Sequence, residues 1–239
     1  MLSMLNRGIS CLRNEVQAHG FSWEKEILLN IYKLTQEEIN EIHYTCKTDL
    51  PAKYNRLDGC DVSIKTTKQP NTVCMANCLS VFDSVSSGVP LHLIVIHYAQ
   101  REAIKVVTEI TKVDLTNSRN VLFGSLSREQ IGELDSMVKS VPQKRKPTPV
   151  EHERMYTLRN ALQEISGEIQ LNIKCNSTQS RLQCSFNQFQ RFVEKNPDRV
   201  LAKSNTHEFC GGCISPEIVS KRRVFKPKPM TILPYLEPS

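Results

Sequence analysis

One short segment of the chain alternates polar and apolar residues and reads Asp61-Val62-Ser63-Ile64-Lys65. In a strand, the first, third and fifth of these side chains share one face, while Val62 and Ile64 point into the core. A carboxylate can hold a divalent cation, and an ammonium group can stabilise charge that develops on a phosphate. The segment therefore fits two interpretations, which are a site for phosphodiester hydrolysis or a half-exposed strand with a structural ion pair.

A magnesium site needs more than one oxygen ligand, so a second carboxylate should converge on Asp61. Glu24 is the strongest candidate, because on the first predicted helix it lies on the inward, apolar side, whereas Glu26 faces solvent. An inward carboxylate is costly unless it is paired or binds a ligand. The alternative is that Glu24 is an ordinary carboxylate favoured by the helix dipole. Two further acids are alternative metal ligands, namely Asp49 and Asp58.

The elements that must position these residues follow from apolar spacing and from cap and turn residues. In chain order, we expect helices over 21–34 and 36–43, a hairpin of 53–57 with 60–66, a helix over 70–82, strands over 91–98 and 104–115, and a helix starting at Ser127 with Gln130 in a capping box. The strand over 91–98 is apolar on both faces, which is typical of a strand buried in the middle of a sheet.

A Pro-rich basic segment divides the chain, and we interpret residues 142–150 as a linker between a catalytic core over 1–141 and a smaller α+β region over 151–239. The charge changes at the same place. Residues 1–140 hold 15 Lys and Arg against 16 Asp and Glu, whereas residues 141–239 hold 16 against 9. A basic region of this kind either binds a polyanion such as DNA or is a solvated surface.

The C-terminal region also contains a predicted hairpin, 169–174 with 181–186, that is rich in amide and basic side chains. Asn, Gln and Arg can bond to base edges, and Lys and Arg can contact phosphates, although a polar hairpin tip can also be merely solvated. The candidate DNA contacts are Lys174, Asn176, Gln179, Arg181, Gln183, Lys221, Arg222 and Arg223.

Nine cysteines without dense spacing indicate reduced thiols rather than a disulfide scaffold. We see neither a secretory signal nor an apolar run of the ~20 residues needed to cross a bilayer, so an intracellular protein is expected. Four of the cysteines could bind a structural zinc ion, although unligated thiols are the favoured interpretation, and these four are Cys175, Cys184, Cys210 and Cys213.

The order of these features resembles the core of the PD-(D/E)xK nuclease superfamily, in particular type II restriction endonucleases, including those of large algal DNA viruses. The resemblance covers residues 20–115 and lies in the helix with Trp23-Glu24, the Asp-Val-Ser-Ile-Lys strand and the buried strand followed by Gln100. It implies an α+β fold with a mixed αβββαβ core, and Mg²⁺-dependent cleavage of duplex DNA. In the implied site, Glu24 and Asp61 bind the metal and Lys65 is the motif lysine.

The chain departs from the family pattern at Ser63, where the family usually has an acid, and it lacks an upstream Pro-Asp pair. Restriction of a palindromic sequence would call for a homodimer. A structure-specific repair or recombination nuclease is an alternative within the enzymes. A non-catalytic nucleic-acid-binding protein, stabilised by zinc and with Asp61 and Lys65 as a structural pair, is the alternative outside them.

Overall fold

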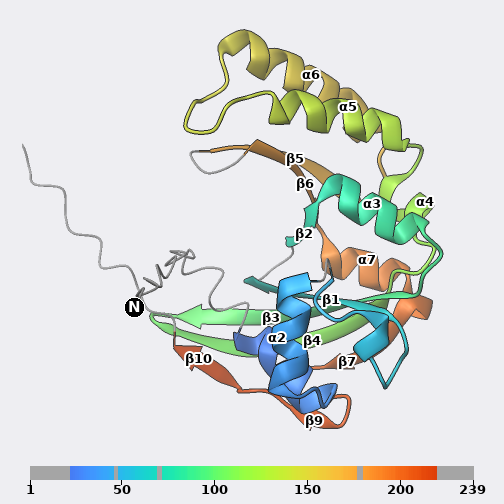
Figure 1. The fold of residues 1–239 in the computed structure, drawn as a ribbon, viewed down its shortest axis with the longest axis vertical. Helices are drawn as coiled ribbons and strands as arrows, with labels where there is room; N and C mark the ends of the chain where they lie inside the picture. The colour runs from blue at the N-terminus through green and yellow to red at the C-terminus, as the bar shows by residue number, and fades with distance from the viewer. Residues whose placement is uncertain (1–21, 46–47, 69–71, 177–179, 220–239) are drawn as a thin grey trace, which may run out of the picture.

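Two main β-sheets, a small two-stranded sheet of β8 (Glu208–Phe209) and β9 (Gly212–Cys213), and the helices around them make up the part of the chain that this computed structural model describes, residues 22–45, 48–68, 72–176 and 180–219 (Figure 1). Helices and strands alternate along the chain, and the larger sheet is mixed. The α+β fold class expected from the sequence is therefore confirmed. Among the described residues, no helix combines the length and apolar character of a membrane span.

The larger sheet has the strand order β1-β3-β4-β10, and β7 also pairs with β4. Its strands are β1 (Asp61–Lys68), β3 (Leu91–Arg101), β4 (Ile104–Asp114), β7 (Val200–Ser204) and β10 (Glu217–Val219). β1 and β3 are parallel, with Lys65 opposite Val95, and the other pairs are antiparallel. A parallel pair requires a crossover connection, and α3 (Cys78–Ser86) lies in it.

The smaller sheet has the order β2-β6-β5 and lies between α5 and α6 on one side and the larger sheet on the other (Figure 1). Its strands are β2 (Val73–Asn77), β5 (Ile169–Cys175) and β6 (Ser180–Phe186). The covering helices are α5 (Arg128–Lys139) and α6 (Pro149–Glu164). The remaining elements are η1 (Ile27–Ile31), α2 (Gln36–Thr45), η2 (Ala52–Tyr54), α4 (Arg119–Phe123), α7 (Phe189–Lys195), η3 (Pro197–Arg199), β8 (Glu208–Phe209) and β9 (Gly212–Cys213).

Two hydrophobic clusters lie on opposite faces of the larger sheet. On β3, Leu93 and Val95 join the cluster shared with α3, α5 and the smaller sheet, whereas Ile94 and Ile96 join the cluster shared with η1 and α2. All four side chains are fully buried. The prediction that this strand is buried on both faces is therefore confirmed.

Other local predictions are also confirmed. Ser127 and Gln130 form the expected capping box at the start of α5. The predicted strands over 91–98 and 104–115 correspond to β3 and β4, and the predicted hairpin to β5 and β6.

Two predicted elements are wrong. The segment expected as a helix from residue 70 begins as strand β2, and α3 starts only at Cys78, where the Asn77 side chain caps it. β2 is extended because it pairs with β6, a partner more than 100 residues away along the chain. The expected strand over 53–57 is instead η2 and a turn, and the outer neighbour of β1 is Leu50, which exchanges two backbone hydrogen bonds with Val62.

Strands on either side of the predicted linker 142–150 belong to the same sheets. β6 pairs with β2, and both β7 and β10 pair with β4. The segment itself connects α5 to α6, which pack against each other. The predicted regions 1–141 and 151–239 therefore share one hydrophobic core between the sheets.

Candidate functional site

The carboxylate that lies beside Lys65 is that of Asp49. Its Oδ2 accepts hydrogen bonds from Lys65 Nζ at 2.7 Å, from the backbone N–H of Ile64 at 2.6 Å and from the Ser63 hydroxyl at 3.1 Å. The bridge between Leu50 and Val62 brings Asp49 alongside β1. The side chains of Asp49 and Lys65 are 24% and 22% exposed, so this pair is held in place and is still reachable from solvent.

Glu24 is the second acid of the site. It lies in the helical turns that lead into η1 and is only 9% exposed. Burial, together with the negative charge of Asp49, raises the pKa of Glu24 to about 8, and the positive charge of Lys65 acts in the opposite direction. The predicted inward orientation of Glu24 is therefore confirmed, and the ionised groups that act on it are Asp49 and Lys65.

Asp61 does not pair with Lys65, whose partner is Asp49, so the structural pair of the non-catalytic alternative is not formed by Asp61. It is on the same face of β1, but its Oδ1 accepts a hydrogen bond from the backbone N–H of Ala52 at 2.8 Å and so fixes the start of η2. Asp61 lines a neighbouring hollow of about 300 Å³ together with Thr48 and Ser84. Asp61 was the first choice of metal ligand and Asp49 an alternative, but Asp49 is the acid that contacts Lys65.

The helix that carries Glu24 is anchored by a segment from the other end of the described chain. The indole N–H of Trp23 donates to the carbonyl of Ser215 at 2.9 Å, and the Glu26 carboxylate accepts hydrogen bonds from the backbone N–H and the hydroxyl of the same serine. The expectation that Glu26 faces solvent is thus wrong. This anchoring fixes the position of Glu24 relative to β1.

Gln100 lies away from these residues. Val95 is opposite Lys65 in the sheet, and Gln100 is five residues further along β3, which is ~16 Å in a strand. Its amide donates to the carbonyl of Glu102 at 3.1 Å. Gln100 lies near the end of β3, which continues to Arg101.

The Asp49 and Lys65 pair borders a hollow of about 190 Å³ between the two sheets. Ser63 lines it from β1, and Ala76 and Ser80 line it from β2 and α3. Ala76 has φ 130°, at an irregularity in the pairing of β2 with β6. Left-handed backbone at a non-glycine residue is strained and is often retained at functional sites.

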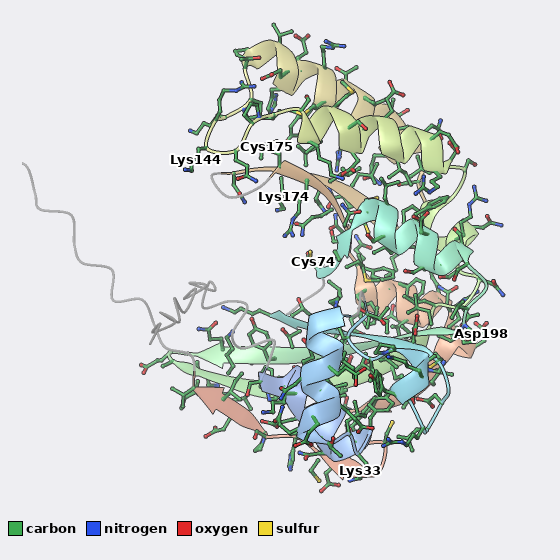
Figure 2. All side chains as sticks on the ribbon, viewed as in Figure 1. Lys33, Cys74, Lys144, Lys174, Cys175 and Asp198 are labelled. Carbon is green, nitrogen blue, oxygen red and sulfur yellow. The ribbon has the colours of Figure 1, made fainter. Side chains whose placement is uncertain are left out.

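The smaller sheet presents a polar face opposite the apolar face that packs on α5. Every second cross-strand pair points to this polar face, and the three pairs are Gln170 with Ser185, Asn172 with Gln183, and Lys174 with Arg181. Most of these side chains line an open hollow of about 550 Å³. Figure 2 shows Lys174 on the side of β5 that is turned toward the larger sheet.

Of the predicted DNA contacts, this arrangement brings together Lys174, Arg181 and Gln183, and Asn176 directly follows β5. The others lie outside the described residues, and they are Gln179, Lys221, Arg222 and Arg223.

A separate group of metal-ligating side chains lies at the start of β1 and consists of Asp58, Cys60 and His92. One ligand atom from each residue lies within 4.8 Å of the others. The Cys60 sulfur is 3.0 Å from Nδ1 of His92, and Oδ2 of Asp58 is 4.0 Å from the same nitrogen. The structure thus contains a candidate metal-binding triad. It was not predicted, because His92 is 32 residues from Cys60 along the chain and comes close to it only when β1 pairs with β3.

The four cysteines predicted as zinc ligands are not brought together. Cys184 is buried against Cys78 between the sheets, and Cys175 lies on the adjacent strand β5. Cys210 occupies the turn between β8 and β9, where the charges of Lys112 and Asp58 act on its thiol. The alternative of a zinc site formed by these four cysteines is therefore wrong, because its two pairs belong to different sheets.

No protein-family model, curated protein or solved structure matches this chain. Its function must therefore be argued from the geometry of the side chains described above.

Proposed function

We propose that this protein is a Mg²⁺-dependent endonuclease that cleaves duplex DNA, with Glu24, Asp49 and Lys65 at its reaction centre. The observation that carries the proposal is that Asp49 and Lys65 pair beside a hollow between the sheets and that both of their charges act on the buried Glu24. A buried acid with a raised pKa next to a charged partner is typical of functional sites.

The donors present fit a magnesium ion. Glu24, Asp49 and Ser63 offer oxygen atoms, which are the ligands that magnesium prefers, and one or two carboxylates are usual in its protein sites. Glu24 and Asp49 repel each other when both are ionised, so a cation held by both would relieve that repulsion. Such an ion, when bound, supplies a Lewis acid for the phosphate and lowers the pKa of a bound water.

The residues themselves would position the reacting groups. The three hydrogen bonds to Oδ2 of Asp49 fix its carboxylate against β1 and hold the Lys65 ammonium beside it. From this position, Lys65 can stabilise negative charge on the phosphate in the transition state. Ser63 holds the carboxylate and is not the nucleophile in this arrangement.

The polar face of the smaller sheet is the proposed DNA-reading surface. Asn, Gln and Arg side chains can make paired hydrogen bonds to bases, and Lys174 can neutralise a phosphate. Cross-strand pairing keeps these side chains in a fixed register, which sequence-specific reading requires. We further propose a homodimer for recognition of a palindromic site, since two-fold DNA calls for a two-fold protein.

The test is incubation of mixed-sequence duplex DNA with the wild-type protein, with Mg²⁺ or with EDTA. We expect discrete fragments only with Mg²⁺, and loss of cleavage in Asp49→Asn and Lys65→Ala. Lys195→Ala is the matched control, because Lys195 pairs with Glu168 at the surface and away from the site. A parallel incubation with duplex RNA tests the choice of substrate.

The result that would overturn the proposal is a salt-sensitive gel shift without cleavage under any of these conditions. That outcome would favour a nucleic-acid-binding protein in which Asp49 and Lys65 are a structural pair. Cleavage retained in both site variants would instead place the reaction centre elsewhere.

A further inference from the structure

The triad Asp58, Cys60 and His92 lies on the opposite face of the larger sheet from Lys65. Cys60 immediately precedes β1, and His92 is on β3 beside the residues whose side chains enter the cluster shared with η1 and α2. Cys60 is 1% exposed, and the side chains of His92 and Asp58 are 15% and 26% exposed. The group is therefore partly shielded and distinct from the proposed nuclease site.

The arrangement does not suit nucleophilic catalysis. In a Cys-His-Asp relay, the carboxylate and the sulfur contact different ring nitrogens. Here both Cys60 and Asp58 face Nδ1 of His92. Burial also raises the pKa of the Cys60 thiol to about 11, which is the reverse of what an activated nucleophile needs.

The same arrangement suits a metal ion, because all three donors converge on one point. A tetrahedral zinc ion, with bonds of about 2.3 Å to sulfur and about 2.0–2.2 Å to nitrogen and oxygen, separates such donors by about 3.4–3.6 Å. The observed separations of 3.0 Å and 4.0 Å from His92 Nδ1 bracket that value. A set of one thiol, one imidazole and one carboxylate favours zinc over magnesium.

The Lys112 ammonium pairs with the carboxylate of this group. It donates to Oδ2 of Asp58 at 2.5 Å, and the Tyr32 hydroxyl contacts the same oxygen at 3.3 Å. Lys112 is itself buried, so it neutralises Asp58 in place of an ion. A metal bound here must compete with Lys112 for the carboxylate.

We propose that Asp58, Cys60 and His92 form a zinc-binding site that fastens the start of β1 to β3. A structural zinc ion takes a fourth ligand, and Cys210 is the candidate because its thiol is close enough for the Asp58 charge to act on it. The role is structural, because the ion would fix the strand from which Ser63 and Lys65 project on the other face. This inference is independent of the proposed nuclease activity.

The test is a zinc titration of the full-length, EDTA-treated protein in competition with a chromophoric chelator, followed by cobalt substitution. We expect one ion per chain, a sulfur-to-cobalt charge-transfer band and a higher Tm with zinc. Cys60→Ser and Asp58→Asn should weaken binding at least 10-fold and abolish the zinc-dependent rise in Tm. Cys74→Ser is the matched control, because Cys74 is exposed on the other sheet.

Lys112→Met keeps the test decisive if the ligand variants fold poorly. Removal of the competing ammonium should tighten zinc binding at least 10-fold. The proposal would be overturned if neither the wild type nor Lys112→Met bound zinc. A cobalt spectrum without a thiolate band would also overturn it. Equal loss of binding in Cys74→Ser would overturn it as well.

Discussion

At the scale of single residues, the proposed site contains a buried acid, Glu24, that lowers the stability of the fold when it is ionised. Glu24 is buried near Asp49, and the charge of Lys65 does not fully offset the loss of hydration. A protein retains such a group when its charge is needed for something other than folding. The consequence can be measured without any assay of activity.

Glu24→Gln should stabilise the metal-free fold by about 1–3 kcal/mol near pH 8. The pKa of Glu24 is raised from 4.5 to about 8 on folding, so its favourable contribution is complete below pH 4.5 and is lost as the pH rises through about 8. Urea unfolding in EDTA at pH 4.5 and pH 8.5 should therefore show a gain for the variant at the higher pH only. Glu153→Gln, on the exposed surface of α6, should show no such difference.

His97 provides a second measurable case. It is fully buried against Phe189, and neither ring nitrogen has a hydrogen-bond partner among the described residues. Burial lowers the pKa of His97 below 6.5, although the nearby Glu109 opposes this. The neutral ring therefore contributes stability that is complete above pH 6.5 and is lost as the pH falls below it.

His97→Leu should reduce the acid sensitivity of the fold. Between pH 7.5 and pH 5, the wild type should lose up to about 1.4 kcal/mol of unfolding free energy per pH unit from this one group, and the variant should lose less. Denaturant unfolding at several pH values measures the difference. If the unfolding free energies of the two proteins change in parallel with pH, His97 has the same pKa in the folded and unfolded states, which would contradict this prediction.

The sequence identified the residues of β1 and the inward Glu24, because alternation and helical spacing are local signals. It ranked the acids wrongly, because Asp61 is close to Lys65 in the chain and Asp49 is close to it only after Leu50 pairs with Val62. The pairing of β1 with a non-adjacent segment has no periodic signature. Contacts between distant segments therefore decided which acid reached the lysine.

At the scale of elements, the strands and helices with strong local signals were predicted, and those shaped by distant partners were not. The capping box of α5 depends on residues three apart. The apolar spacing of β2 suggested that α3 begins earlier. β2 is extended instead because it pairs with β6, and this pairing leaves no local signal in the sequence. Two glycines allow the effect of local helix propensity to be compared with the effect of packing against a distant segment.

Gly132→Ala should stabilise the protein by about 0.5–1 kcal/mol, because Gly132 lies inside α5 and an added Cβ meets no atom within 4 Å. Gly167→Ala should destabilise it by about 1–3 kcal/mol, because the added Cβ would lie 2.1 Å from the carbonyl oxygen of Val121. Thermal unfolding of the two variants compares the effects directly. A fall in Tm for the first, or no change for the second, would contradict this account.

At the scale of the whole molecule, the chain passes between its two sheets more than once. β2 leaves the first sheet to pair with β6, and β7 and β10 return from the C-terminal region to pair with β4. Composition and charge suggested that the chain divides into two regions at 142–150. These properties reflect the residues at the surface and not those that pack in the core. The core does not follow that division, since three aromatic residues from beyond it fill the space between the sheets, and they are Phe186, Phe189 and Phe192.

Residues 1–141 alone should therefore not form a cooperative fold. The fragment would lack the partner of β2 and two neighbours of β4, and it would expose the surface that the three phenylalanines cover. Urea unfolding followed by near-UV circular dichroism, with the full chain as control, measures this. A sigmoidal transition of the fragment would show that residues 1–141 fold independently.

The hydrogen bond from the Ile64 backbone to Asp49 has a further consequence, because β1 is the last strand of its sheet. The outward N–H of an edge strand is a docking point for a strand of another molecule, and proteins commonly block such points. Leu50 covers the N–H of Val62, and the Asp49 carboxylate covers that of Ile64. Asp49, the acid proposed for catalysis, therefore also blocks a backbone group that could pair with a strand of another molecule. Replacing Asp49 would favour aggregation in addition to the proposed loss of cleavage.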